Sequence, residues 1–364
     1  MEPSDGRLMH SALRIQNSAL PMTPDLYRVA ILHGAGYGGG ELLRLLLAHP
    51  SFTPVAVTSR TFAGQPVTAA HPHLAGTTDL AFTGEDDFNP AGVDALFVAA
   101  EHGQSAKAVA ALDAAGYEGR IVDLSADFRF RDAAVYPASF GFEHPCPERI
   151  ADFAYSIPEI HALPDGARCV ANPGCFATGI TLALWPLAQH LPGFEAHVTA
   201  LTGASGSGAR PSSTTHFPTR DGNVRAYKVL SHQHQPEIEA TLGADVTLRF
   251  APASGPWTRG IWGTAHVALP SGVLADDVRG WFEAAYPAGG AVRLWPGLPE
   301  LRYSVGTPFC DLGVEVRDGH AVVGFGLDNL LKGAASQAVQ NLNRLFGFDS
   351  MLGLAPMRAV SLDV

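Results

Sequence analysis

One segment near the start of the chain sets its architecture: Tyr27-Arg28-Val29-Ala30-Ile31-Leu32-His33-Gly34-Ala35-Gly36-Tyr37-Gly38-Gly39-Gly40-Glu41. Its first six residues predict a short apolar strand, and a helical pattern runs from about Glu41 to Ala48. The turn between them contains the pattern G-x-G-x-x-G, whose glycines let the backbone approach a pyrophosphate at the N-terminus of the next helix. The alternative is a tight turn without a ligand. The residues expected to hold a dinucleotide there are Gly34, Gly36, Tyr37, Gly38 and Gly39.

The first half of the chain alternates strands and helices. Strands are expected at Phe52–Thr58, Val93–Ala99 and Arg120–Leu124, and an Ala-rich helix at Gln104–Ala115. This alternation is typical of a parallel sheet with helices on both faces. We therefore predict an α/β Rossmann domain with a mostly parallel sheet over residues 26–172.

The pattern changes after about residue 172. An apolar helix, Phe176–Ala188, is followed by longer strand-like runs at Val198–Thr202, Val246–Phe250, Ile261–Leu269 and Gly313–Arg317. These runs predict an α+β domain with a mixed, mostly antiparallel sheet over residues 173–328. A long helix is expected at Asn329–Phe346, because its apolar residues recur at helical spacing. We expect residues 329–348 to return and complete the first domain.

The composition excludes several classes of protein. The chain has 364 residues, of which 46% are hydrophobic and 16% charged, and its formal net charge is −11. It has no basic cluster for a nucleic acid, and no apolar run reaches membrane-spanning length. None of the four cysteines forms C-x-x-C, which predicts a reduced, cytoplasmic protein. Residues 1–25 predict a disordered N-terminal extension, and Met22 is an alternative start of translation.

The end of the second strand indicates which dinucleotide binds. An NAD-dependent enzyme usually places an acidic residue there for the ribose 2′-hydroxyl. This chain instead has Thr58-Ser59-Arg60-Thr61. The hydroxyl of Ser59 and the guanidinium of Arg60 suit a 2′-phosphate, because arginine makes charge-assisted, bidentate hydrogen bonds. We therefore favour NADP(H) over NAD(H), and the alternative is that Arg60 is an ordinary loop arginine.

One cysteine is the candidate nucleophile. The run Asn172-Pro173-Gly174-Cys175 leads directly into an apolar helix. Unpaired N–H groups and the helix dipole at that position favour a thiolate over a thiol. A thiolate there would form a thioester, which accepts hydride well and so links the cysteine to the cofactor site. The alternative is a buried structural thiol, which is how we interpret the other three cysteines.

Two histidines separated by one residue, His232 and His234, are the candidate bases. In an extended segment their side chains lie on the same side, and Pro236 and Glu237 follow as a first helical turn. A metal site built on this pair lacks a third ligand in the sequence, so we predict no metal. Either histidine can serve as the base, and the sequence does not distinguish them.

Two further segments are candidates for holding anionic groups. The Gly- and Ser-rich loop from Thr202 to Arg210 offers N–H groups and one guanidinium for a phosphate or carboxylate. The run from Ser125 to Arg129 follows the fourth strand, and ligands bind beyond the carboxyl ends of such strands. The alternatives are an ordinary glycine loop and an ordinary Asp–Arg surface pair.

Together these motifs resemble one family over residues 27–348, the N-acetyl-γ-glutamyl-phosphate reductases of arginine biosynthesis, within the aspartate-semialdehyde-dehydrogenase-like superfamily. The matching runs are Gly36–Leu43, Val122–Arg129, Tyr155–Ile160, Asn172–Cys175, Thr202–Gly208, His232–Ile238 and Asp328–Ala335. The resemblance implies that Cys175 is the nucleophile and that the histidine pair supplies the base and an oxyanion partner. It also implies that the second domain is catalytic and forms the interface of a homo-oligomer, either a dimer or a tetramer.

The same resemblance completes the expected site. On the cofactor side it adds Ser207 and also Asn329, which would lie near the nicotinamide. On the substrate side the expected residues are Arg129, Asn172, Ser205 and Arg210. The implied reaction is the NADPH-dependent reduction of a small-molecule acyl phosphate through a cysteine thioester, with inorganic phosphate as the leaving group. Two positions depart from the family pattern: His33 replaces the usual first glycine, and Gln233 replaces a usual arginine.

Other functions remain open at this point. A sister family reduces a carrier-protein-linked 2-aminoadipate 6-phosphate in lysine biosynthesis, and Val57–Val67 is similar to it. The net charge of −11 disfavours an acidic carrier protein, so this family ranks second. An N-succinylglutamyl substrate is also open. Rivals from other classes are a cofactor-free cysteine hydrolase or acyltransferase, which has no use for the glycine turn, and a non-catalytic NADP-binding regulator, which has no use for the cysteine run.

Overall fold

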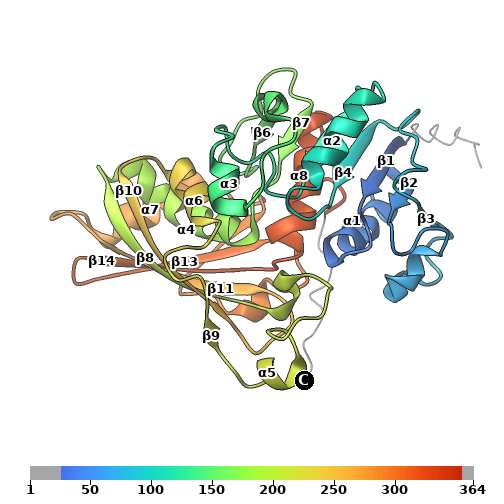
Figure 1. Cartoon of the computed structure of the whole chain (residues 1–364). Helices are drawn as coiled ribbons and strands as arrows, with labels where there is room; N and C mark the ends of the chain where they lie inside the picture. The colour runs from blue at the N-terminus through green and yellow to red at the C-terminus, as the bar shows by residue number, and fades with distance from the viewer. Residues whose placement is uncertain (1–25, 355–364) are drawn as a thin grey trace, which may run out of the picture.

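Two seven-stranded sheets organise the computed structural model, which describes residues 26–354. They lie side by side in Figure 1, with the N-terminal sheet in blue to green and the C-terminal one in yellow-green to orange. The expected N-terminal extension and Met22 lie outside the described residues. Within them, no helix combines the length and the hydropathy needed to cross a membrane.

All seven strands of the first sheet are parallel, which confirms the predicted fold class. Their order is β3-β2-β1-β4-β5-β7-β6. Two of them, β1 and β2, have the predicted bounds, whereas β3, β6 and β7 were not predicted. The strands are β1 (Tyr27–Leu32), β2 (Phe52–Thr58), β3 (Phe82–Thr83), β4 (Ala95–Val98), β5 (Arg120–Asp123), β6 (Phe153–Tyr155) and β7 (Cys169–Ala171).

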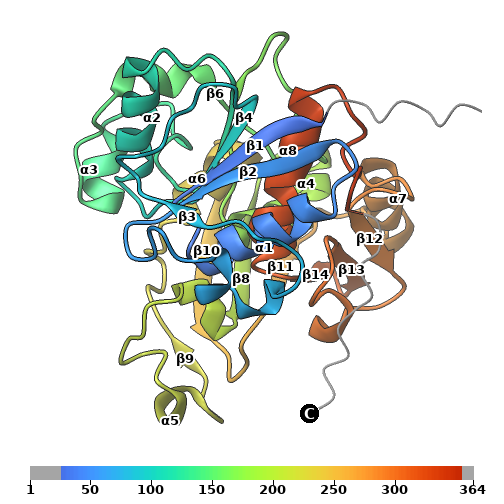
Figure 2. The same cartoon turned by 90° about the vertical axis from the view of Figure 1, so that its right-hand side faces the viewer.

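Helices cover both faces of this sheet (Figure 2). On one face, α1 (Tyr37–Leu47) and the C-terminal α8 (Ser336–Leu345) share a buried apolar cluster with strand residues such as Ile31. On the other face, α2 (Ser105–Ala114) and α3 (Val135–Phe140) enclose a second cluster. The C-terminal α8 therefore packs on the first sheet.

The second sheet is mixed and mostly antiparallel, with the order β12-β13-β14-β11-β8-β10-β9. Only the pairs β8/β10 and β12/β13 are parallel. One face packs against α4 (Cys175–His190), α6 (Gln235–Leu242) and α7 (Ala275–Ala285), while the short α5 (Phe217–Arg220) lies at the projecting end near β9 (Figure 1). The strands are β8 (Phe194–Thr202), β9 (Arg225–Ala226), β10 (Val246–Ser254), β11 (Ile261–Ala268), β12 (Val292–Trp295), β13 (Cys310–Arg317) and β14 (His320–Leu327).

The long C-terminal helix that the sequence predicts is divided in the structure. A π-helical turn, Leu331–Ala335, precedes α8. The carboxylate of Asp328 accepts the N–H groups of Leu330 and Leu331 over 2.9 and 3.1 Å, which starts the turn. A Cβ on Gly333 would lie 2.8 Å from that of Cys175, so the wide turn brings bare backbone against the candidate nucleophile. Such π turns are found mostly at functional sites.

Candidate active site

A single cleft of about 1340 Å³ brings together loops from both sheets. Of the residues predicted for the site, Gly34 and Gly39 do not line this cleft. The predicted residues that do line it are Gly36, Tyr37, Gly38, Ser59, Arg60, Arg129, Asn172, Cys175, Ser205, Ser207, Arg210, His232, His234 and Asn329.

The glycines of the first turn have two different tasks. A Cβ on Gly39 would overlap the carbonyl of Gly34, and one on Gly34 would overlap Val57, so these two glycines permit close packing. A Cβ on Gly36 or on Gly38 would meet no neighbouring atom within 4 Å, and both glycines line the cleft. No side chain caps the N-terminus of α1, so its free N–H groups are available to an anion. The turn therefore fits a pyrophosphate.

Sequence reasoning missed an acidic residue, Glu85, which lines the cleft together with Ser59 and Arg60. Arg60 is largely exposed, and its Nε lies 2.7 Å from Glu85 Oε2. Glu85 Oε1 lies 2.8 Å from His33 Nδ1. His33 replaces the usual glycine and has a φ of +56°, in the left-handed region that favours glycine. Glu85 follows a two-residue strand, and no motif marks it.

Cys175 is the first residue of α4, and its thiol is partly buried in the cleft wall. The expectation of a stabilised thiolate is wrong for the free protein. Burial raises the pKa of the Cys175 thiol to about 11, and this outweighs the lowering by the Phe176 N–H and by Arg129. The helix N-terminus alone therefore does not ionise the thiol, and a base is required.

Glu237 organises the cysteine loop, a role that sequence reasoning missed. Its Oε1 accepts the N–H of Gly174 and the hydroxyl of Tyr155, each over 2.8 Å. Its Oε2 lies 3.3 Å from Arg129 Nη1. All these groups are buried or nearly so, and Glu237 lies in the first turn of α6. The only sequence signal was its place three residues after His234.

The two histidines differ in their hydrogen bonds. His232 Nδ1 accepts the backbone N–H of His234 over 3.1 Å, so the neutral ring of His232 carries its proton on Nε2. His234 Nδ1 is buried without a hydrogen-bond partner among the described residues. The His234 ring packs against Gly174, where a Cβ would overlap it. Burial lowers the pKa of His232 to about 4 and that of His234 well below its usual value, so both rings are neutral at pH 7.

Gln233, the second departure from the family pattern, is accompanied by a cation. Lys228 Nζ donates to Gln233 Oε1 over 2.8 Å. Lys228 itself has a positive φ of 44°. Its charge also lowers the pKa of His232, after burial. A positive charge is therefore present beside the histidine pair although the arginine is absent.

The predicted anion-binding residues differ in how deeply they are buried and in how many hydrogen bonds they make within the protein. The guanidinium of Arg129 is almost fully buried and donates to the carbonyls of Asn172 and Leu124 over 2.8 and 3.0 Å. The side chain of Asn172 is bound to Asn341 and to the Ala334 carbonyl, so it ties the cysteine loop to the C-terminal helix. Arg210, in contrast, is exposed at the cleft mouth, 3.4 Å from Glu101.

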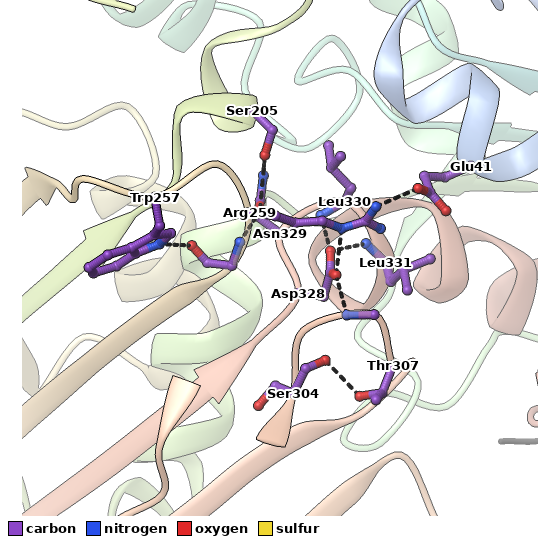
Figure 3. A network of polar contacts seen from close by, with 12 residues as sticks. Glu41, Ser205, Trp257, Arg259, Ser304, Thr307, Asp328, Asn329, Leu330 and Leu331 are labelled. Carbon is purple, nitrogen blue, oxygen red and sulfur yellow. Dashed lines mark hydrogen bonds and ion pairs between the residues drawn. The ribbon is translucent and has the colours of Figure 1, made fainter. Parts of the chain in front are cut away.

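Asn329 lies at the centre of a polar network that joins the two sheets (Figure 3). Its Oδ1 accepts the N–H of Gly260 over 2.7 Å, and its Nδ2 donates to Ser205 Oγ over 3.0 Å. Ser205 belongs to the short helical turn Ala204–Ser207 of the Gly- and Ser-rich loop. The predicted cofactor residue and the predicted substrate residue are therefore in direct hydrogen-bond contact through their side chains.

The same network reaches the cofactor turn through Arg259, which sequence reasoning missed. Arg259 Nε lies 2.6 Å from Asp328 Oδ2, and its Nη1 lies 2.6 Å from Glu41 Oε1 (Figure 3). Asp328 directly precedes Asn329, and Glu41 is on α1. Arg259 therefore ties α1 to the residues around Asn329. These contacts join positions far apart in the sequence, so no local pattern reveals them.

Among residues 26–354, no group of three or more histidine, cysteine or acidic side chains is placed to hold a metal ion. The chain matches two family models: "Semialdehyde dehydrogenase, NAD binding domain" over residues 28–164 and "Semialdehyde dehydrogenase, dimerisation domain" over residues 175–329. The N-acetyl-gamma-glutamyl-phosphate reductase of Methanothrix thermoacetophila is 38% identical over 340 residues, which cover 90% of this chain and 97% of that protein. This chain belongs to the N-acetyl-γ-glutamyl-phosphate reductase family.

Two other similarities extend beyond the N-acetyl-γ-glutamyl-phosphate reductases. The [LysW]-L-2-aminoadipate 6-phosphate reductase of Deinococcus radiodurans is 38% identical over 344 residues, covering 92% of this chain and 98% of that protein. A solved aspartate semialdehyde dehydrogenase II from Vibrio cholerae, complexed with ASA, has a TM-score of 0.68 at 17% identity, covering 88% of this chain and 98% of that one. At this low identity the last similarity establishes the shared fold alone.

Proposed function

We propose that this chain catalyses the NADPH-dependent reduction of N-acetyl-γ-glutamyl phosphate to N-acetylglutamate 5-semialdehyde, with release of inorganic phosphate. The observation that carries the proposal is one continuous cleft with the glycine turn at one end and Cys175 beside the histidine pair at the other. A cysteine hydrolase needs only the second half, and a nucleotide-sensing regulator only the first. The Methanothrix relative supports the identity of the acyl group.

The cofactor side fits NADP(H) on the geometry of this chain. The N–H groups at the start of α1 and the open space at Gly36 and Gly38 suit the pyrophosphate. Ser59 and Arg60 suit a 2′-phosphate, and Asn329 is proposed to lie near the nicotinamide. When bound, NADPH supplies the hydride that the thioester carbon receives. We assign cofactor binding to residues 26–172 with 329–348, and catalysis to residues 173–328.

Acyl transfer to the enzyme begins with removal of the thiol proton. His234 is the proposed base, because its ring is neutral and its buried Nδ1 is not committed to another group. The Cys175 sulfur forms a bond to the acyl carbon, and the bond from that carbon to the phosphate oxygen breaks with its electron pair. Phosphate leaves and a thioester remains. Arg210 and the N–H groups of its loop are proposed to receive the phosphate.

Aldehyde release reverses the proton transfer. After hydride arrives, the carbon holds an oxyanion and the Cys175 sulfur. His232 is the proposed oxyanion donor, because its Nδ1 is an acceptor and its Nε2 therefore carries the proton. The carbon–sulfur bond then breaks, and His234 returns a proton to the thiolate. Burial of the thiol favours this last step, because it raises the pKa of Cys175 to about 11.

The assembly and location of the protein are further parts of the proposal. The match to a dimerisation-domain model over residues 175–329 supports a homo-oligomer. We propose a dimer or a tetramer, with the second sheet at the interface. A cytoplasmic location stays a prediction from the composition.

The reverse reaction tests the proposal. Purified protein is mixed with NADP, inorganic phosphate and N-acetylglutamate 5-semialdehyde, and NADPH formation is followed by absorbance. We expect phosphate-dependent turnover that is lost in Cys175→Ala. Turnover without phosphate, or equal turnover by Cys175→Ala, would contradict the proposal.

A second candidate is the carrier-linked 2-aminoadipate phosphate reductase. The Deinococcus relative is as similar as the Methanothrix one, and Gln233 with Lys228 departs from the usual arginine. Comparing kcat/KM for N-acetylglutamate semialdehyde with that for the carrier-linked semialdehyde separates the two. We expect the first substrate to be preferred.

A further inference from the structure

Glu85 lies in the part of the cleft that the proposed function assigns to the ribose of a dinucleotide. It follows β3, and the Thr83 carbonyl of that strand accepts the N–H of Ser59 over 3.0 Å. Glu85 lines the cleft together with Ser59 and Arg60. In open parallel sheets the ribose hydroxyls are recognised beyond the end of the second strand. An acidic side chain thus occupies this position from a neighbouring strand.

Both oxygens of this carboxylate are in use. Oε1 lies 2.8 Å from His33 Nδ1, and Oε2 lies 2.7 Å from Arg60 Nε. The side chain of Glu85 is 21% exposed, whereas that of Arg60 is 69% exposed. The solvent-exposed side chain of Arg60 therefore pairs with a carboxylate that is more buried than the guanidinium. The guanidinium proposed for the 2′-phosphate already has an anionic partner.

His33 reinforces the position of Glu85. Its backbone has a φ of +56°, and its N–H donates to Thr58 Oγ1 over 2.9 Å. A glycine would adopt this conformation more readily, but only a side chain can hold Glu85. Burial lowers the pKa of His33, so its ring is mostly neutral at pH 7. The charges that face each other are then those of Arg60 and Glu85, which cancel.

We propose that Glu85 reduces the preference of this site for NADPH over NADH by competing with the 2′-phosphate for Arg60. The carboxylate repels a 2′-phosphate and can accept the 2′-hydroxyl of NADH, as acidic residues do in NAD sites. Glu85 is thus a specificity-determining residue of the cofactor site. This inference rests on the proposed function, because it assumes that the cleft holds a nicotinamide dinucleotide.

Binding measurements on Glu85→Gln test the inference without relying on turnover. The dissociation constants of NADPH and NADH are measured by titration calorimetry for the full chain and the variant. Glutamine keeps the size of the side chain and its acceptor oxygen but removes the charge. We expect the ratio of NADH to NADPH dissociation constants to rise roughly tenfold, since a charge-assisted bond to Arg60 is freed for the phosphate. An unchanged or lower ratio would overturn the inference.

The chain offers a matched control for this variant. Glu195 on β8 also pairs with one histidine and one arginine, His197 and Arg249, each over 2.9 Å, but it does not line the cleft. Glu195→Gln is expected to leave both dissociation constants unchanged. An equal change in the ratio for Glu195→Gln and Glu85→Gln would mean a general charge effect and would overturn the assignment to Arg60.

A double-mutant cycle identifies the partner. In an Arg60→Met background, Glu85→Gln is expected to raise the ratio much less than in the unmodified chain, because only the direct effects of the carboxylate on the ribose remain; an equal rise in both backgrounds would overturn the role of Arg60. The proposed function fails separately: if the unmodified chain binds neither dinucleotide, both ideas fall. If it binds NADPH and turns over, but Glu85→Gln does not shift the ratio, only the present inference falls.

Discussion

The Nδ1 atom of His232 accepts the backbone N–H of His234 over 3.1 Å, and this bond places the two histidines in different hydrogen-bonding environments. One ring nitrogen of His232 is committed to holding the start of α6. The Nδ1 of His234 is buried and uncommitted among the described residues. This difference in hydrogen bonding supports the proposed roles of His232 as oxyanion donor and His234 as base, which the H-x-H pattern alone does not distinguish.

Substituting the two histidines separately tests this division. His234→Asn is expected to lower kcat by roughly 10²- to 10⁴-fold, the usual contribution of a general acid–base. His232→Asn keeps an acceptor near the His234 N–H, so its kcat is expected to fall less than that of His234→Asn. The measurement is steady-state kinetics of both variants with circular dichroism to confirm folding. A larger loss for His232→Asn would reverse the assignment.

The thiol titration is a second prediction. Burial raises the pKa of Cys175 to about 11, so the neutral thiol dominates at pH 7 and the reactive thiolate appears only as the pH rises. The rate of alkylation of the free protein by iodoacetamide should therefore still be increasing at pH 9 to 10, by about tenfold per pH unit. A rate that levels off below pH 8 would contradict the burial argument.

Glu237 provides a check on the cause of that shift. Its negative charge is one of the influences that raise the pKa of the Cys175 thiol, after burial. Glu237→Gln should lower the thiol pKa and speed alkylation at pH 8. The same change leaves the buried Arg129 without its ionic partner. The free energy of unfolding of the variant should therefore fall by about 3 kcal/mol. Slower alkylation in a folded variant would show that Glu237 acts mainly through the position of Gly174.

Gly174 and Gly333 make the room that Cys175 and His234 require. A Cβ on Gly174 would overlap the His234 ring. Gly174→Ala is therefore expected to displace the base and lower kcat by at least about 100-fold. Gly280→Ala is the matched control, because Gly280 is exposed on α7 with open space around it. That control should keep full activity and gain up to about 1 kcal/mol of stability.

Arg259 tests the link between the cofactor helix and Asn329. Arg259→Met removes the ionic partner of the buried Asp328 and leaves Glu41 with Arg44 alone, so both stability and NADPH affinity should fall. Arg293→Met is the matched control. Arg293 also pairs with a fully buried carboxylate, Asp311, at 2.6 Å, but it lies away from the cleft. Both variants should lose about 2–4 kcal/mol in denaturant unfolding, and only Arg259→Met should bind NADPH less tightly. Equal NADPH affinities for the Arg259→Met and Arg293→Met variants would mean that Arg259 has a structural role only.

Much of the fold is local in origin and was predictable. Strands β1 and β2 match their predicted bounds because an apolar run next to a turn specifies a buried strand. The same method missed β14, since Gly324 and Gly326 weaken its strand pattern. Gly324 is needed there because a Cβ would lie only 3.0 Å from that of Leu298. The π turn was missed because the apolar spacing of residues 329–346 fits a continuous helix and carries no signal for a wide turn.

The site was predictable as a set of residue types but not as an electrostatic environment. Most of the chosen residues line one cleft, because their motifs follow strand ends that meet at one edge. The charge state of Cys175 was not predictable, since it depends on burial by distant segments. The contacts of Glu85 with His33 and of Arg259 with Glu41 join positions far apart in the chain. Such pairs leave no local pattern.

The central claim is that the acyl group passes through a thioester on Cys175. The most direct test is to mix the protein with N-acetyl-γ-glutamyl phosphate in the absence of NADPH, quench in acid and record the intact mass. The account predicts a mass increase equal to one N-acetylglutamyl group, mapped to the peptide that contains Cys175 and discharged by NADPH. Normal turnover with no adduct, or an adduct on another residue, would contradict it.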